Sequence, residues 1–439
     1  MDVNARLPRP IRRRLLGGLV LRTATPDDIE RLADFNVRVH GDELHRAGTW
    51  DEFGGGHPVL TVRHQLLVED VASGAIVSAA YLLPMRWRLG SVELPVGQIE
   101  AVGTDPAYRR RGLSRRIIDA LHDMSVAQGH LLTGIVGVRY LYRRFGYEYA
   151  VPFDGFRNQE RSAVHAEPGG GPRVRLARLD DAEALCALRR MWTDELDLAE
   201  VVDADRFRFD IAGHVPGSFM AVDFSVAVDD GDRPIAYARA PSGPDEGWAA
   251  VTEVVLGPDG RGQEASTVRQ LAVSVLETVD GVAKAPVPGI RWWLGTDHRI
   301  YDLLAPDLGP LDPPYAWYIR IPDAARLLRA LAPVLDARLG ASRLAGFDGT
   351  LTIDRWTETL RLDIAHGRIA KVASSRPRET DGVRGDATIP PLLLAQLVLG
   401  YRTIDELRAT FPDVWRADRS AALLAILFPR LRAWMPRLG

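Results

Sequence analysis

Cysteine is nearly absent from this chain of 439 residues, since Cys186 is the only one. A single cysteine excludes disulfides within the chain and thiol-rich metal sites, and it fits a reducing compartment. An excess of one charge is also lacking, since 55 basic and 58 acidic residues leave a formal net charge of −3. The net charge therefore does not indicate binding to nucleic acid or to a membrane surface. Long apolar runs are missing too. The stretch 15–21, which follows a basic N-terminus, is too short to span a membrane and lacks a convincing cleavage site. We therefore predict a cytoplasmic protein.

The length predicts two to four domains, and a weak internal repeat suggests what two of them are. Residues 21–32 return as residues 174–185, and each copy has the pattern of a strand, a polar cap and a helix. In the first copy Thr25 is the expected N-cap and Pro26 the first helical residue. The alternative is that any strand leading into a helix shows this pattern. We expect two related α/β units.

Two stretches rich in glycine or proline set the expected domain boundaries. Residues 167–172 read Glu-Pro-Gly-Gly-Gly-Pro, which can continue neither a helix nor a central strand. A second boundary falls near residues 313–322, beyond which helix, strand and helix patterns indicate an α+β unit. The predicted domains are residues 1–166, 173–312 and 313–439.

The segment with the clearest chemistry is Val102-Gly-Thr-Asp-Pro-Ala-Tyr-Arg-Arg-Arg-Gly-Leu-Ser114. It reads as a strand that breaks into an Arg/Gly turn and restarts as a helix with one apolar stripe. A further strand over residues 131–136 and a short helix over 140–145 follow. Such a turn directs backbone N–H groups, arginine side chains and a helix N-terminus to one place, which suits a diphosphate. The alternative for three consecutive arginines is a solvated surface.

This order of elements resembles the GNAT acyltransferase superfamily, whose diphosphate signature falls here on Arg109, Gly112 and Ser114. Ser114 departs from the small apolar residue of that signature. The resemblance implies acetyl-CoA as the co-substrate, and we expect no metal because the spacing of the histidines over residues 40–57 matches no zinc motif. The residues that it implies for acetyl-CoA binding are Val102, Thr104, Arg109, Arg110, Arg111, Gly112, Leu113, Ser114 and Gly137.

The layout of the whole chain resembles the enhanced-intracellular-survival (Eis) family of acetyltransferases. The resemblance implies a fold of the α/β and α+β classes: two fused GNAT-like domains, each a mixed sheet flanked by helices, followed by a sterol-carrier-protein-like α+β domain. In the second unit, the loop 257–262 lacks the Arg-to-Gly spacing, so that unit is expected to bind no CoA. The resemblance also implies a homo-oligomer, with a hexamer as the form that members often take.

Two catalytic residues are implied by the same resemblance. The segment Tyr142-Arg-Arg-Phe-Gly-Tyr147 matches the family segment with the general-acid tyrosine, at Tyr142. Tyrosine suits that role because its pKa near 10 keeps it protonated at neutral pH. The alternative is a tyrosine that only packs in the core. The implied base is the carboxylate of the chain end, Gly439, although this chain lacks the terminal aromatic residue of the family.

The acceptor follows only in part from these residues. A small-molecule amine or a lysine-containing acceptor is expected, and aminoglycosides, polyamines and lysine side chains stay open. Some acids could line a pocket for a positively charged acceptor, but we expect them to be solvated surface charges. They are Asp34, Asp42, Glu43, Asp51 and Glu52. The nearby histidines match no zinc spacing. The alternative function is a non-catalytic protein that binds acyl-CoA or a hydrophobic ligand, with the apolar run 391–399 lining a tunnel rather than packing in a core.

Overall fold

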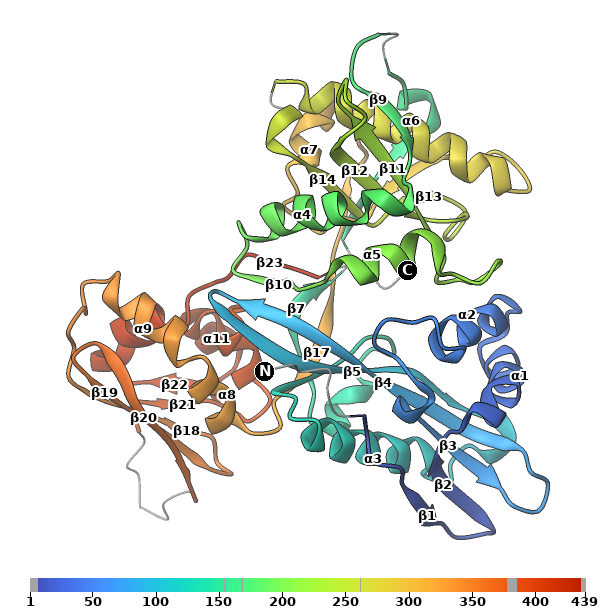
Figure 1. Cartoon of the computed structure of the whole chain (residues 1–439). Coiled ribbons are helices and arrows are strands. Elements are labelled where there is room, and N and C mark those ends of the chain that lie inside the picture. The colour runs from blue at the N-terminus through green and yellow to red at the C-terminus, as the bar shows by residue number, and fades with distance from the viewer. Residues whose placement is uncertain (1–6, 154, 167–168, 261, 377–384, 436–439) are drawn as a thin grey trace.

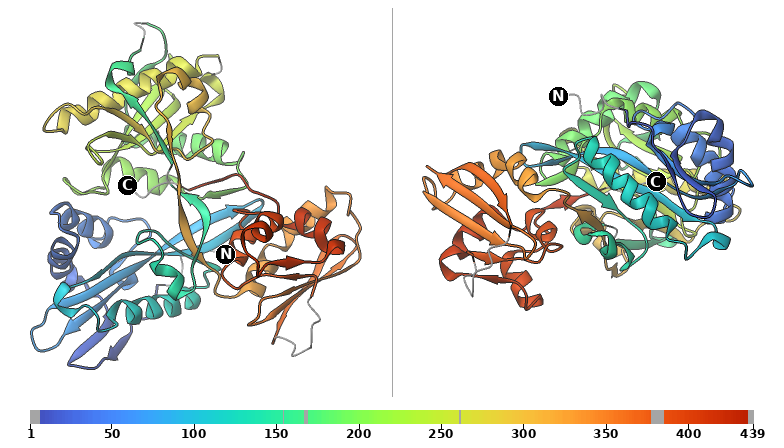
Figure 2. Two further views of the ribbon diagram at one scale, coloured as in Figure 1. Left: turned by 180° about the vertical axis from the view of Figure 1, so that it is seen from behind. Right: turned by 90° about the horizontal axis from the view of Figure 1, so that it is seen from below.

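The computed structural model describes the chain except residues 1–6, 154, 167–168, 261, 377–384 and 436–439. Its helices and strands form three units (Figure 1). The first two are α/β units that face each other across a seam, and the third lies beside the first, as the views from behind and from below show (Figure 2). Among the described helices, none has the length and apolarity needed to cross a bilayer.

The first unit is built on a long twisted sheet with helices on both faces. Its strands run in the order β1-β2-β3-β4-β5-β6-β17-β7. Buried side chains of one face pack against α3, and those of the other pack against α1. The elements of this unit are β1 (Arg12–Arg14), β2 (Leu19–Thr23), α1 (Ile29–His40), α2 (Leu44–Phe53), β3 (Gln65–Asp70), β4 (Ile76–Leu89), β5 (Val92–Thr104), α3 (Leu113–Ala127), β6 (Leu132–Ile135), the 3₁₀ helix η4 (Leu141–Phe145), β7 (Glu148–Phe153) and β17 (Tyr315–Arg320).

The second unit contains two four-stranded sheets, β14-β12-β11-β9 and β13-β15-β8-β16. Helices α4 and α5 cover one face of the first of these sheets, and α6 covers the other. Its elements are β8 (Phe156–Glu160), β9 (Arg173–Leu176), α4 (Ala182–Thr193), β10 (Leu198–Glu200), α5 (Ala204–Ala212), β11 (Val222–Val228), β12 (Pro234–Pro241), β13 (Ala249–Val251), β14 (Glu253–Leu256), α6 (Glu264–Val282), β15 (Gly289–Trp292), α7 (Ile300–Leu303) and β16 (Leu311–Asp312).

The third unit has a five-stranded sheet in the order β20-β19-β18-β21-β22. Residues 393–399 are buried in a core that this unit shares with the first, and α10 packs on β7. This packing favours a core role for the run 391–399. The elements are α8 (Ala324–Ala330), α9 (Ala332–Gly340), β18 (Gly349–Asp354), β19 (Thr359–Ala365), β20 (Arg368–Ser375), β21 (Ala387–Thr388), α10 (Leu394–Val398), α11 (Ile404–Thr410), β22 (Trp415–Arg416), α12 (Ala421–Leu427) and β23 (Ala433–Trp434).

The internal repeat is visible in the way both α/β units begin. In the first, Thr25 precedes a 3₁₀ turn at Pro26–Asp28, and the helix α1 follows. An arginine of the preceding strand pairs with the aspartate of that turn in both copies, through Arg22 with Asp28 and Arg175 with Asp181, each at 2.7 Å. The repeated sequence therefore encodes the same strand, cap and helix twice.

Three strands cross the domain boundaries expected from the sequence. β8 precedes the 167–172 boundary and pairs with β15 of the second unit. β17 follows the boundary near residue 313 and lies between β6 and β7 in the sheet of the first unit. At the seam, β10 pairs antiparallel with β4 and parallel with β23 near the chain end. The residue pattern of a strand shows which of its faces is apolar but not which strand lies beside it. The pairing of these strands across the expected boundaries could therefore not be predicted from the sequence.

Candidate active site

A wedge opens in the first sheet where β5 and β6 part. The two strands pair in parallel from Val96 and Leu132 to Ile99 and Ile135, where β6 ends while β5 continues to Thr104. On the other side of β5, the register with β4 shifts and Ala101 has a φ of 50°. This bulge re-aims β5 at the point where the wedge begins.

The Arg/Gly turn lies directly beyond this wedge. Gly112 has a φ of 73° and caps α3, and Arg110 also has a positive φ, of 64°. The first N–H groups of α3 have no acceptor within the helix, and the guanidinium groups of residues 109–111 are exposed. A Cβ on Gly112 would meet no atom within 4 Å, so the space over the turn is open. The Oγ1 atom of Thr104 lies 3.1 Å from Ser114 Oγ, which ties the turn to β5.

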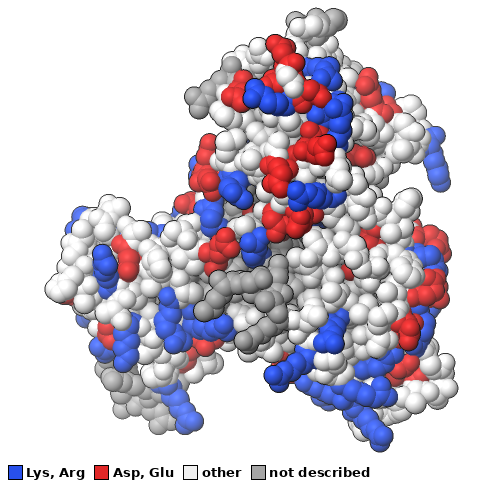
Figure 3. Space-filling model, in the orientation of Figure 1, with Lys and Arg blue, Asp and Glu red and all other residues white. Residues whose placement is uncertain are grey.

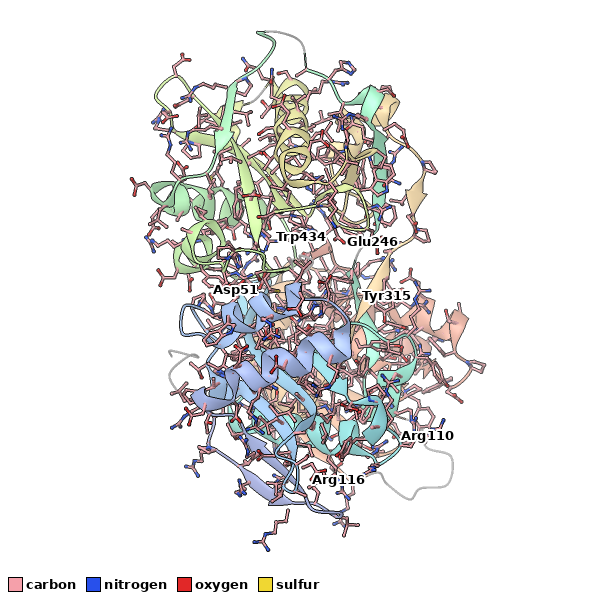
Figure 4. The ribbon with its side chains drawn as sticks, turned by 90° about the vertical axis from the view of Figure 1, so that its right-hand side faces the viewer. Asp51, Arg110, Arg116, Glu246, Tyr315 and Trp434 are labelled. Atoms are coloured by element: carbon pink, nitrogen blue, oxygen red, sulfur yellow. The ribbon has the colours of Figure 1, made fainter. Side chains whose placement is uncertain are left out.

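The surroundings of the turn are positively charged. Lys and Arg side chains gather over α3 and β1 in Figure 3, where residues 12–14 and Arg115 are exposed. In Figure 4, Arg110 and Arg116 lie farther from the second unit than Asp51 and Trp434, which lie where the two units meet. The Leu113 side chain is buried in the core, so only its amide faces the turn. The predicted diphosphate residues are therefore together, with open space before them.

Tyr142 lies close to Gly137 at the edge of the wedge. The hydroxyl oxygen of Tyr142 is 3.8 Å from the place of a Cβ on Gly137, and Tyr315 donates a hydrogen bond of 2.8 Å to the Gly137 carbonyl. Burial, together with the nearby carboxyl of Glu100, raises the pKa of Tyr142 to about 12. The phenol is thus protonated at neutral pH, as a proton donor must be. Gly439, the predicted base, lies outside the described residues.

Two acids, Glu52 and Glu100, lie beside Tyr81 of β4. Tyr81 donates a hydrogen bond of 2.6 Å to Glu52, and it pairs across the strands with Glu100. Burial raises the pKa of Glu52 to about 8, and partial burial raises the pKa of Glu100 to about 7. Glu52 was expected to be solvated and is only 5% exposed, because the end of α2 lies against β4, where Phe53 packs edge-on on Tyr81. Glu100 was not among the predicted site residues, although a charged residue within an otherwise apolar strand could have indicated it.

Replacing Glu52 by Gln is expected to flatten the dependence of stability on pH. Between the ordinary pKa of 4.5 and the folded value of about 8, the folded chain keeps a proton that the unfolded chain loses, so stability falls as pH rises. The glutamine keeps the acceptor for Tyr81 and has no such cost. We expect the free energy of unfolding of the variant, relative to that of the unaltered protein, to be at least about 1.4 kcal/mol more favourable at pH 8 than at pH 5, as measured by thermal unfolding. An equal loss of stability in both proteins between these pH values would contradict the assignment.

Asp51 was also expected to be solvated and instead joins the two α/β units. His214, which follows α5, lies 2.9 Å from Asp51 through its Nδ1 atom and 3.7 Å from Asp210 through its Nε2 atom. Burial opposes the charged imidazole, but hydrogen bonds to these two carboxylates raise the pKa of His214. The predicted surface acids Asp34, Asp42 and Glu43 are exposed. In the part of the chain that the structure describes, no cluster of three or more His, Cys, Asp or Glu could hold a metal ion.

The last described strand, β23, has the direction that leads along β4 toward Tyr81. β23 runs parallel to β10, which runs antiparallel to β4, so the direction from Ala433 to Trp434 corresponds to that from Leu89 toward Trp87 and Tyr81. Trp434 packs edge-on against Trp192, with ring centroids 4.6 Å apart. The last described residues are therefore anchored by β10 and by the ring of Trp192.

Comparison with known proteins assigns this unit. Residues 20–150 match the sequence profile of the family described as Acetyltransferase (GNAT) domain. They form a GNAT acetyltransferase domain. The chain is an acyltransferase, and domains of this family use acetyl-CoA. No curated protein matches the sequence of the chain.

Solved structures similar to the chain extend over nearly all of it. A GCN5-related N-acetyltransferase from Anabaena variabilis has a TM-score of 0.67 and 14% identity, over 95% of this chain and 99% of that one. A GCN5-related N-acetyltransferase from Kribbella flavida has a TM-score of 0.63 and 17% identity, over 96% and 98% of the two chains. Eis1 from Mycobacterium abscessus has a TM-score of 0.55 and 16% identity, over 95% and 99%. These likenesses show that the GNAT-like fold is shared, with helices flanking its sheets.

Proposed function

We propose that the protein is an acetyl-CoA-dependent N-acetyltransferase that transfers the acetyl group to a primary amine by direct attack in a ternary complex. The observation that carries the proposal is the Arg/Gly turn at the start of α3, next to the wedge between β5 and β6. The exposed guanidinium groups of residues 109–111 and the free amides at Gly112, Leu113 and Ser114 suit the diphosphate of CoA. Val102, Thr104 and Gly137 border the wedge that would take its acetyl and pantetheine arm.

The wedge supplies the groups that acetyl transfer needs. The amine nitrogen attacks the thioester carbon, and an N–H of β5 between Val102 and Thr104 stabilises the negative charge that grows on the carbonyl oxygen. The carbon–sulfur bond then breaks, and the departing thiolate takes the hydroxyl proton of Tyr142. The phenolate regains a proton from solvent. The raised pKa of Tyr142 favours this return, because the protonated phenol is its stable form.

The amine must lose a proton during the reaction, and we assign its removal to the carboxylate of Gly439. The direction of β23 toward Tyr81 supports this assignment, since the remaining residues continue from an anchored Trp434. An α-carboxylate has a pKa near 3.5, so it acts best by orienting the amine or through a relayed water. Acceptors in the proposed class are aminoglycosides, polyamines and lysine side chains.

The other two units have supporting roles in this proposal. In the second, α6 begins with Glu264, whose carboxylate accepts the Gly262 N–H at 2.8 Å. An acidic residue at this helix start disfavours a diphosphate, so the second unit binds no CoA. We propose that the third unit is a sterol-carrier-like domain that positions the chain end, and that the protein works in the cytoplasm as a homo-oligomer, with a hexamer as the leading form.

The test is whether acetyl-CoA binds at the turn. Acetyl-CoA at 100 times its dissociation constant should stabilise the protein by about 2.7 kcal/mol, seen as a higher melting temperature. The double variant Arg109→Ala/Gly112→Trp should lose the shift, because a bulky side chain fills the space over the turn. Arg343→Ala, at an exposed arginine of the third unit, is the matched control and should keep it. Absence of a shift in the unaltered protein at millimolar acetyl-CoA, with no CoA released by any amine tested, would overturn the proposed function.

A further inference from the structure

The two α/β units carry a glutamate at the same place in their sheets. In the first unit Glu100 pairs across the strands with Tyr81, and in the second Glu253 pairs in the same way with Arg239. Arg22 of β2 and Arg175 of β9 occupy equivalent positions in the repeat. Counting residue by residue across the paired strands from each arginine leads to these two pairs, so the pairs are equivalent. The two units can therefore be compared residue by residue around this glutamate.

The second unit neutralises its glutamate with a buried arginine. Arg189 of α4 lies 3.1 Å from Glu253 through Nε and 3.0 Å from Glu200 through Nη2, and Tyr237 donates a hydrogen bond to Glu253. Arg189 is 4% exposed and Glu253 is 2% exposed. A buried carboxylate requires such a partner, because the cost of removing it from water is otherwise large. This site is thus complete within the chain.

The first unit has the same carboxylate without the cation. α1 and α4 occupy the same place in the repeat, and Asn36 of α1 corresponds to Arg189 of α4. Asn36 donates a hydrogen bond of 2.9 Å to Thr49 and brings no charge. Glu52 and Glu100 instead accept hydrogen bonds from the uncharged Tyr81 and Gln98. Tyr81 lies at the position of Arg239, so the first unit has neither Arg189 nor Arg239 of the second.

A second unmatched group lies beside Glu100. Gln98 is fully buried and donates a hydrogen bond to the Glu100 carboxylate through its amide nitrogen. Its carbonyl oxygen, Oε1, is buried without a hydrogen-bond partner in the described part of the chain. A buried acceptor in this state costs free energy unless a donor arrives. A ligand with several N–H groups would satisfy both Gln98 and Glu100.

We propose that the acceptor's cationic nitrogen binds in the first unit where the Arg189 guanidinium lies in the second, held by the Glu100 carboxylate and by Gln98 Oε1. The inference rests on the proposed acetyl transfer and assigns the residues that hold the positive charge of its aliphatic amine acceptors, a charge that arylamines lack at neutral pH. Glu100 is partly exposed, whereas Glu253 is sealed by Arg189, so a ligand can reach it. Glu100 follows Ile99, the last residue of β5 that pairs with β6, so the bound nitrogen lies where the wedge begins.

The experiment compares 1,4-diaminobutane with aniline in CoA-release assays on the full chain. Glu100→Gln should raise KM for the diamine by about 10- to 100-fold, since a charge-assisted hydrogen bond is lost, and should change KM for aniline less than threefold. Asn36→Arg should raise KM for the diamine to a similar extent, because it supplies the guanidinium internally. Asn36→Gln is the matched uncharged control and should stay within about threefold of the unaltered protein.

The acetyl-CoA melting shift separates this inference from the function on which it rests. Glu100→Gln and Asn36→Arg should both keep the shift, which shows that each variant folds and binds the co-substrate. An unchanged KM for the diamine in Glu100→Gln, with turnover and the shift retained, overturns the inference and leaves the acetyltransferase assignment standing. An equal rise in KM for both amines also overturns it, because recognition of charge affects only the diamine.

Discussion

Replacing Tyr142 by Phe is expected to lower kcat by about 100- to 1,000-fold and to leave KM for acetyl-CoA within about twofold. The substitution removes one hydroxyl from a side chain that is 4% exposed and packs edge-on against Tyr147 and Tyr318, so the ring contacts persist. What is lost is the proton for the departing CoA thiolate. Steady-state release of CoA thiol, with the acetyl-CoA melting shift as the measure of binding, checks the prediction.

The neighbouring Tyr147 offers a matched control for this substitution. It is fully buried, and its hydroxyl lies 2.7 Å from His122 Nε2, away from the wedge. Tyr147→Phe should therefore lower stability by about 1 kcal/mol and leave kcat within about threefold. If Tyr142→Phe keeps more than a third of kcat, Tyr142 is a packing residue and another group protonates the thiolate.

Replacing Arg189 by Met is expected to destabilise the protein by about 3–5 kcal/mol. The guanidinium is the cation between Glu253 and Glu200, and methionine leaves the two carboxylates near each other and out of water. Arg189 also lies over the ring of Trp434, 5.5 Å from its centroid, so the anchor of the chain end is weakened as well. Urea and thermal unfolding, followed by tryptophan fluorescence, measure the loss.

The adjacent Arg190 is the control for Arg189, because it lies on the same helix and is exposed. Arg190→Met should change stability by no more than about 0.5 kcal/mol. The double variant Arg189→Met/Glu253→Gln should recover part of the loss, since it removes one of the two charges left without a partner. A single Arg189→Met variant as stable as the unaltered protein would falsify the view that this ion pair holds the second unit together.

The features that could be predicted from the sequence are the local ones. The helix α3 starts at Leu113, directly after the Arg/Gly turn, because both its apolar stripe and its glycine cap are written within a few residues. The same holds for α1, which follows its Thr25 and Pro26 start signal. The place of β17 could not be predicted, because the choice of β6 and β7 as partners is a contact between segments far apart in the chain.

The candidate site divides along the same line. The Arg/Gly turn is one continuous segment and can be recognised from its residues, whereas Asp51 and Glu52 were expected to be surface charges. Their burial depends on α2 docking in the seam, where His214 of the other unit contacts Asp51. The equivalence of Glu100 and Glu253 depends on the pairing of strands that are far apart in the chain. A single helix or strand pattern contains neither of these facts.

The placement of β17 has a consequence for how the protein is made. At 5–20 residues per second, a ribosome needs about 10–30 s after finishing β7 to deliver the strand that belongs beside it. During that interval the edges of β6 and β7 have no neighbour, and unpaired strand edges invite association with other chains. The nascent chain is thus exposed to chaperones for as long as the second unit is being translated, and the acetyltransferase sheet closes only after that unit has emerged.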